Sequence, residues 1–161
     1  MSNIDPFGRT DSLDEGTLMA LVARFEARGQ HLLFSSMLDN YLDAMCIDDA
    51  TLVLDAGCRT GLAARTIARR RRFSGRVRAI DLSPYLVEAA KRLAAEEGVA
   101  ERIDFGVENM QSLAIADESF DAVVAHTLLS HVDDPLAVSK KSHASSKSAG
   151  RLPYSMGTMR H

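Results

Sequence analysis

Two carboxylates and two glycines are spaced so that together they could hold a nucleotide. Asp55 ends an apolar, strand-forming run and is followed by Gly57, Gly61 and a helix-forming segment. Glycine permits a tight turn close to a ligand, and the N–H groups that open a helix favour an anionic group. Asp81 ends a second apolar run 24 residues after Gly57, near the separation at which a carboxylate accepts hydrogen bonds from ribose. The alternatives are a purely structural glycine turn and, for Asp81, a turn-forming or capping role.

The spacing of the glycines separates two kinds of nucleotide site. A dinucleotide site has the pattern Gly-x-Gly-x-x-Gly, which from Gly57 requires glycine where this chain has Arg59 and Leu62. This mismatch disfavours a nicotinamide-dependent oxidoreductase. The pattern present, Asp55-x-Gly57-x-x-x-Gly61, resembles motif I of the class I S-adenosylmethionine-dependent methyltransferases, which nearly always have glycine at position 59. We expect the Arg59 side chain to crowd the methionine end of the cofactor, unless it swings out to solvent.

Alternating strands and helices are expected to position these residues. Apolar runs predict strands at 51–55, 77–81, 102–106 and 116–125. The glycine turn and the second strand are each followed by a helix-forming segment, and this alternation predicts a parallel sheet with right-handed crossovers. The expected fold is therefore α/β, a Rossmann-like parallel sheet with helices on both faces.

Two amphipathic helices are predicted before the first strand, at 12–29 and 34–45. Ser12 and Glu15 have the spacing of a capping box. Ser83 is predicted to cap the helix that follows the second strand, because a proline in the next position suits the first helical turn. In the resembled family such N-terminal helices cover the substrate pocket, and plain core packing is the alternative.

The resemblance extends over residues 50–138. Its last part, Phe120-Asp121 followed by Leu129-x-His131, is similar to the type 11-like methyltransferase domains that act on small molecules and lipophilic metabolites. The resemblance implies S-adenosylmethionine as the cofactor and implies no metal, because the sulfonium is already an activated methyl donor.

The resemblance also implies roles for individual residues. Asp81 would bind the ribose and Leu82 would pack on the adenine. Asn109 stands where the family has an acid that contacts the adenine amino group, and its carbonyl can still accept a hydrogen bond. His126 and His131 are candidate general bases, with helix packing as the alternative for His131. The implied cofactor-binding residues are Asp55, Ala56, Gly57, Gly61, Asp81, Leu82, Asn109, Met110 and His126.

A shift in charge marks the main boundary in the chain. Residues 1–134 carry 14 basic and 22 acidic groups, a net charge of −8, whereas residues 135–161 carry five basic groups and no acid. We expect an N-terminal helical cap at 1–48, a cofactor-binding domain at 49–138 and a basic, low-complexity tail at 139–161. The tail has no sustained apolar stripe, so the C-terminal strands of the family are expected to be missing. The fourth strand would then be an exposed apolar edge that favours self-association.

Composition excludes several classes of protein. The 161 residues contain no apolar run long enough for a membrane span and no signal peptide, so a cytoplasmic protein is expected. Two cysteines make neither a disulfide framework nor a zinc cluster. The run Arg69–Arg72 is either a nucleic-acid patch or a helix end whose cations suit the negative end of the dipole. The abundant acids of residues 1–134 favour the helix end, so nucleic-acid binding is not expected.

The leading hypothesis is a methyltransferase that transfers a methyl group to a small-molecule acceptor. The alternative is a non-catalytic or inactive S-adenosylmethionine-binding remnant, because Arg59 and the altered C-terminal region depart from the family pattern.

Overall fold

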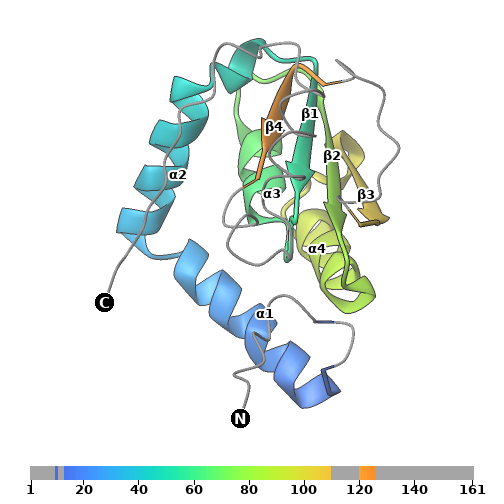
Figure 1. The fold of residues 1–161 in the computed structure, drawn as a ribbon. Coiled ribbons are helices and arrows are strands. Elements are labelled where there is room, and N and C mark those ends of the chain that lie inside the picture. The colour runs from blue at the N-terminus through green and yellow to red at the C-terminus, as the bar shows by residue number, and fades with distance from the viewer. Residues whose placement is uncertain (1–9, 11–12, 110–119, 126–161) are drawn as a thin grey trace.

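The computed structural model describes residue 10 and residues 13–109 and 120–125 (Figure 1). The α-helices of this part are α1 (Glu15–Gly29), α2 (Leu32–Ala44), α3 (Leu62–Arg69) and α4 (Pro84–Glu96). The strands are β1 (Leu52–Ala56), β2 (Arg76–Asp81), β3 (Ile103–Val107) and β4 (Ala122–Val124). Short 3-10 helices at Ile47–Asp49 and Ala100–Arg102 lead into β1 and β3.

The described strands form one parallel sheet in the order β3-β2-β1-β4. β1 lies in the interior of the sheet, between β2 and β4, and Val53 and Leu54, which point to opposite faces of the sheet, are fully buried. Its register places Asp55 beside Ala79 of β2 and Val124 of β4. The predicted α/β class with a Rossmann-like parallel sheet is confirmed.

The fourth strand, predicted with its lead-in at 116–125, lies within that range. The ladder with β1 covers Ala122–Val124, whereas residues 116–119 and 126–161 of the chain lie outside the described part. The predictions for the basic tail and for missing C-terminal strands therefore stay predictions.

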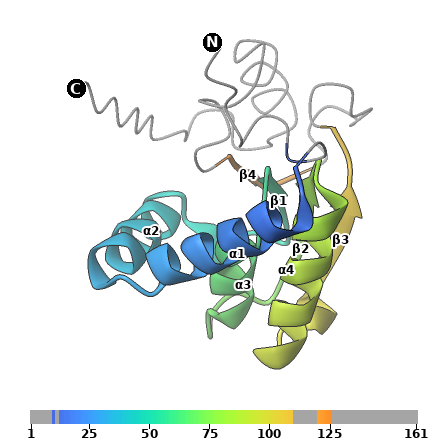
Figure 2. The same cartoon turned by 90° about the horizontal axis from the view of Figure 1, so that it is seen from below.

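Helices α2, α3 and α4 cover one face of the sheet (Figure 2). Val53, Val77 and Val124 point into the core shared with these helices. Leu54 and Val123, which alternate with them along β1 and β4, pack together on the other face. No described helix contributes to this second cluster.

Helix α1 begins later than the capping box predicted. Its N-cap is Asp14, whose carboxylate accepts hydrogen bonds from the backbone N–H (3.0 Å) and the hydroxyl (2.6 Å) of Thr17. The predicted cap at Ser12 was wrong because Asp14, an equally good capping residue, is nearer to the apolar stripe. The prediction for Ser83 is confirmed: its hydroxyl accepts a hydrogen bond from the N–H of Leu86 at 3.3 Å.

The Phe120-Asp121 motif has a structural role far from the glycine turn. The carboxylate of Asp121 accepts hydrogen bonds from the N–H groups of Thr51 (2.8 Å) and Leu52 (3.0 Å). These bonds join the start of β4 to the start of β1, so they fix the register that brings the carboxyl ends of both strands level.

Candidate functional site

The loop after β1 is a tight turn that only unusual backbone conformations allow. The φ values of Gly57, Arg59 and Gly61 are 72°, 53° and 75°. They lie in the left-handed region, which residues other than glycine rarely adopt. The N–H groups of Gly57 and Cys58 donate to the carbonyl of Ile80 at 2.8 and 2.9 Å. These bonds hold the turn against the end of β2. Arg59, which stands where the family has glycine, keeps the left-handed backbone that glycine would adopt.

Asp81 lies at the carboxyl end of β2, where it connects two loops. One carboxylate oxygen accepts from the N–H of Arg59 at 2.8 Å and the other from the N–H of Ser83 at 2.9 Å. Burial raises the pKa of Asp81, although these hydrogen bonds oppose the shift. Both bonds fit the alternative that Asp81 is a turn-forming residue. They do not exclude ribose binding, because the two oxygens of a carboxylate can accept about four hydrogen bonds. Bracing the loops therefore leaves capacity for ribose hydroxyls.

Asp55 is more deeply buried than Asp81, with 2% of its surface exposed. One oxygen accepts from the N–H of Ala64 at 3.0 Å, in the first turn of α3. Burial raises its pKa to about 7, and the negative charge of Asp81 adds to the shift. A carboxyl group that titrates near neutral pH beside a glycine turn is typical of a functional site.

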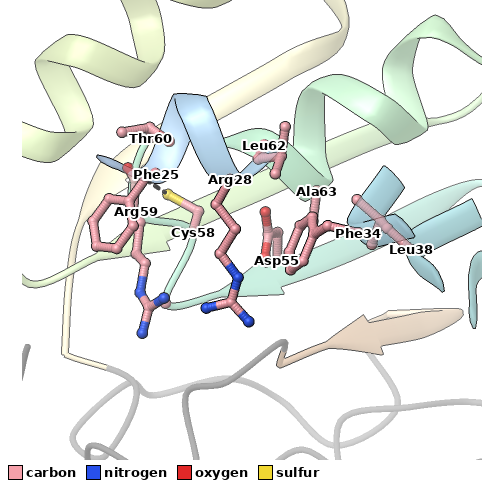
Figure 3. Close-up of a pocket in the computed structure, with 11 residues that line it drawn as sticks. Phe25, Arg28, Phe34, Leu38, Asp55, Cys58, Arg59, Thr60, Leu62 and Ala63 are labelled. Atoms are coloured by element: carbon pink, nitrogen blue, oxygen red, sulfur yellow. Dashed lines mark hydrogen bonds between the residues drawn. The ribbon is translucent and has the colours of Figure 1, made fainter. Parts of the chain in front are cut away.

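A small pocket lies over the turn (Figure 3). Helices α1 and α2 contribute Phe25, Arg28, Phe34 and Leu38 to its lining, and Asp55, residues 57–60, Leu62 and Ala63 contribute the rest. Its volume is about 50 Å³, whereas pockets for whole ligands are roughly 300–1,000 Å³. The pocket therefore has room for one end of a ligand only. The two N-terminal helices do cover the predicted site.

Arg59 does not swing out to solvent, because it is half-buried and lines the pocket. Its guanidinium carbon lies over the ring of Phe25 in α1, 4.8 Å from the ring centre. The side chain thus leaves the turn and contacts the covering helix, and Figure 3 shows its guanidinium directed away from the turn.

Two apolar side chains are exposed beside Asp81. Leu82 is 49% exposed and Val107, the register partner of Asp81 at the end of β3, is 50% exposed. Exposed apolar side chains at the carboxyl ends of neighbouring strands suit the face of a flat base. The sequence indicated Leu82 as an adenine contact but did not indicate Val107. The only signal for Val107 was its place directly after the strand predicted at 102–106.

The remaining predicted site residues fall into two groups. Ala56 is fully buried in the sheet, so only its backbone could face a ligand, and Asn109 is exposed just beyond β3. Met110, His126 and His131 lie outside the described residues, so their predicted roles stay predictions. Within the described ranges, no group of three or more His, Cys, Asp or Glu side chains could hold a metal ion.

A larger cavity of about 290 Å³ lies between α2 and α3 and shares Leu38 and Leu62 with the pocket over the turn. Arg69 and Arg70 line it, but both are ion-paired: Arg69 with Glu97 at 2.8 Å and Arg70 with Asp48 at 2.7 Å. These pairs at the end of α3 favour the helix-end explanation of the arginine run. The smaller pocket at the turn is therefore the better candidate site.

Comparison with known proteins places the chain in a family. The family model described as a methyltransferase domain matches residues 54–153, more than half of the chain, so the chain belongs to this methyltransferase-domain family. The match extends past the domain boundary predicted at residue 138. No helix in the described residues is both long and apolar enough to cross a membrane.

Similar proteins agree with this family. The chain is 36% identical over 113 residues to the ubiquinone biosynthesis O-methyltransferase of Xanthomonas axonopodis pv. citri, covering 70% of this chain and 45% of that protein. The enzyme of the same name from Xanthomonas campestris pv. campestris is 37% identical over 123 residues, covering 76% and 49%. The chain thus spans about half the length of the curated relatives it matches.

Solved structures share the fold. The [4+2]-cyclase SpnF superimposes with a TM-score of 0.65 at 27% identity, covering 71% of this chain and 42% of that one. The N-terminal domain of EvdMO1, solved with SAH bound, gives a TM-score of 0.61 at 22% identity, covering 69% and 45%.

Proposed function

We propose that the chain binds S-adenosylmethionine and transfers its methyl group to a small-molecule acceptor. The observation that carries the proposal is the joint placement of a left-handed glycine turn and the Asp81 carboxylate at the carboxyl ends of β1 and β2. In open α/β sheets this edge is where nucleotide ligands bind. The relatives that match this chain are named O-methyltransferases, which supports methyl transfer as the reaction.

The residues present fit this cofactor. Asp55 and the turn would surround its amino-acid end, where the buried carboxyl faces the pocket. Asp81 would accept from the ribose hydroxyls, and Leu82 and Val107 would contact the adenine face. Asn109, exposed at the end of β3, could accept from the adenine amino group. Met110 and His126 are proposed as further contacts because of their place in the sequence.

The protein's task in this reaction is positioning. The bound cofactor supplies a methyl group already activated on a sulfonium. Helices α1 and α2 cover the site with Phe25, Phe34 and Leu38, so they exclude water and confine the acceptor. Holding reactants in line in this way is worth roughly 7–11 kcal/mol. His126 and His131 are the candidate bases for an acceptor proton.

A second candidate function is a cofactor-binding protein without methyl transfer. Arg59 in the position where the family has glycine favours it. SpnF, named as a cyclase, is a reminder that the fold alone does not fix the reaction.

Calorimetry separates these functions. We expect binding of S-adenosylmethionine and of its demethylated product, and no binding of NAD. Methyl release with candidate acceptors would then distinguish the enzyme from the inactive binder. Binding of NAD in place of S-adenosylmethionine would contradict both.

Asp81→Ala is expected to weaken S-adenosylmethionine binding by roughly 1.5–3 kcal/mol, the range for hydrogen bonds to a charged group. Because Asp81 also accepts from Arg59 and Ser83, the variant leaves two N–H groups without this partner and should also lose stability. Asp81→Asn, whose single carbonyl oxygen can still accept one of these two hydrogen bonds, is the less disruptive variant for calorimetry. Unchanged affinity in folded variants would remove Asp81 from the site.

The domain bounds 1–48, 49–138 and 139–161 and a cytoplasmic location remain part of the proposal. Within the described residues β4 pairs with β1 on one side only. We expect weak self-association through this edge, visible as a rise in sedimentation mass with concentration. Ala125→Lys, which puts a charge at the end of β4, should reduce the rise. A mass that stays monomeric at all concentrations would contradict the expectation.

A further inference from the structure

Arg78 of β2 binds two acids of the neighbouring strand segment, on the face of the sheet opposite helices α2, α3 and α4. It alternates with Val77, which points into the core shared with these helices, so its own side chain lies on the other face. Asp104 is its register partner in β3, and Glu108 comes directly after β3. The guanidinium donates a hydrogen bond to each of these two carboxylates. One cation therefore connects the middle of β2 with the segment that follows β3.

The strand leaves room for this ion pair at one position. Gly106 lies between Asp104 and Glu108 on the same face. A Cβ on Gly106 would lie 2.5 Å from a guanidinium nitrogen of Arg78 and 2.7 Å from a carboxylate oxygen of Glu108, too close for a side chain to share the space. The side chains of Arg78 and Glu108 are each 28% exposed, so water and salt screen the pair less than an ion pair on the open surface. The pair thus lies close against the backbone of β3.

The segment that the pair holds borders the proposed position of the adenine ring. β3 is the edge of the described sheet, so among the described strands β2 alone supports it (Figure 1). Beyond the ladder, the N–H of Glu108 donates to the carbonyl of Asp81 at 3.0 Å. Val107 and Asn109, the proposed adenine contacts from this segment, come directly before and after Glu108. A displacement of Glu108 would therefore move both of them relative to Asp81.

We propose that Arg78 is a positioning residue for base recognition: through Glu108 it holds Val107 and Asn109 where the site distinguishes adenine from other bases. The inference rests on the proposed function. Arg78 acts through Glu108, since its guanidinium binds protein carboxylates. Without this cation, the partly buried carboxylate of Glu108 would turn towards water, because an unpaired charge is costly to bury. The segment that carries the adenine contacts would then lose its fixed position.

The test compares the binding of S-adenosylhomocysteine and S-inosylhomocysteine, in which a carbonyl oxygen replaces the amino group of the base. Calorimetry on the full chain should show roughly tenfold or greater preference for the adenine ligand, because the analogue leaves an acceptor of the site without its donor. In Arg78→Met and in Glu108→Ala this preference should fall to about one third or less. The double variant should lower it no further than Arg78→Met does, because both substitutions remove the same ion pair.

Asp104→Asn is the matched control. Asp104 pairs with the same guanidinium, but its side chain is 63% exposed and it lies within β3, before the adenine segment. This variant should keep the preference for adenine. Urea unfolding of each variant separates a loss of stability from a loss of base preference. If Arg78→Met does not fold, Glu108→Ala decides, because its backbone bond to Asp81 remains.

Three outcomes would contradict the inference. An unchanged preference in folded Arg78→Met or in Glu108→Ala would overturn it and leave Arg78 with a structural role, while the proposed function stands. Equal binding of both ligands by the wild-type chain would also overturn it, because the site would then have no base preference to maintain. Failure of the wild-type chain to bind S-adenosylhomocysteine would refute the proposed function, and the inference with it.

Discussion

Arg65→Met is expected to lower the free energy of unfolding by about 3–5 kcal/mol, the cost of removing one partner from a buried ion pair. Arg65 of α3 is 2% exposed. It donates two hydrogen bonds to Glu26 of α1, at 2.7 and 2.9 Å, and a third to Glu97 after α4. The substitution leaves two partly buried carboxylates without this cation.

The same substitution should loosen the cover of the candidate site. Glu26 neighbours Phe25, and Arg28 follows on the same helix, so the bond to Arg65 holds α1 over the pocket. Urea unfolding measures the stability. Loss of S-adenosylmethionine affinity in the folded variant would report the displaced helix.

A matched arginine on the surface provides the control. Arg92 pairs with Glu96 on α4, with both side chains more than half exposed, and such pairs contribute roughly 0–1 kcal/mol. Arg92→Met should therefore be nearly neutral. Adding Glu26→Gln to Arg65→Met should recover part of the loss, because the charge that Glu26 would otherwise carry without Arg65 disappears, whereas Glu97 keeps Arg69 as a partner. A loss below about 1 kcal/mol in Arg65→Met would show that α1 is held by apolar packing instead.

Asp55→Asn is expected to stabilise the protein at neutral and alkaline pH but not in acid. The folded-state pKa of Asp55 is about 7, compared with 3.8 for an ordinary aspartate, chiefly because of burial. Below about pH 4 Asp55 is protonated in both the folded and the unfolded protein, so its raised pKa has no effect on stability. As the pH rises from about 4 to 7 the unfolded chain releases the proton first, so stability falls by about 4 kcal/mol and then levels off.

The asparagine variant does not titrate at this position, and its side-chain carbonyl can still accept from Ala64. The stability of Asp55→Asn minus that of the wild type should therefore rise by about 4 kcal/mol between pH 4 and pH 8. Urea unfolding across this pH range measures the stability of both proteins. The contributions of the other titratable groups cancel in the difference, except that of Asp81, whose coupling to Asp55 also makes the difference rise with pH.

Asp14 supplies a control of opposite sign. Its hydrogen bonds with Thr17 lower its pKa, so its contribution is present above pH 4 and is lost as the pH falls. Asp14→Asn minus wild type should accordingly decrease as the pH rises. A constant difference for Asp55→Asn from pH 4 to pH 8 would mean that Asp55 is ionised in the folded protein at ordinary pH.

The alternation of strands and helices, the glycine turn and the places of the two carboxylates could all be predicted from the residues alone. These features depend on local rules. A buried parallel strand needs a continuous apolar run, Gly57 and Gly61 permit the left-handed turn, and Ser83 with Pro84 defines a helix start. Asp55 and Asp81 therefore lie at the ends of neighbouring strands, as their spacing predicted.

Contacts between side chains that are distant in sequence could be seen only in the folded structure. Arg59 avoids crowding the turn because the ring of Phe25, 34 residues earlier, lies beside it. Arg65, which the sequence marked only as part of a helix, is buried because acids from two other helical segments surround it. Asp81 braces two loops through the hydrogen bonds that it accepts from Arg59 and Ser83. Hydrophobic periodicity fixes which face of an element is buried, but the partner that a charged group meets there depends on how the elements pack.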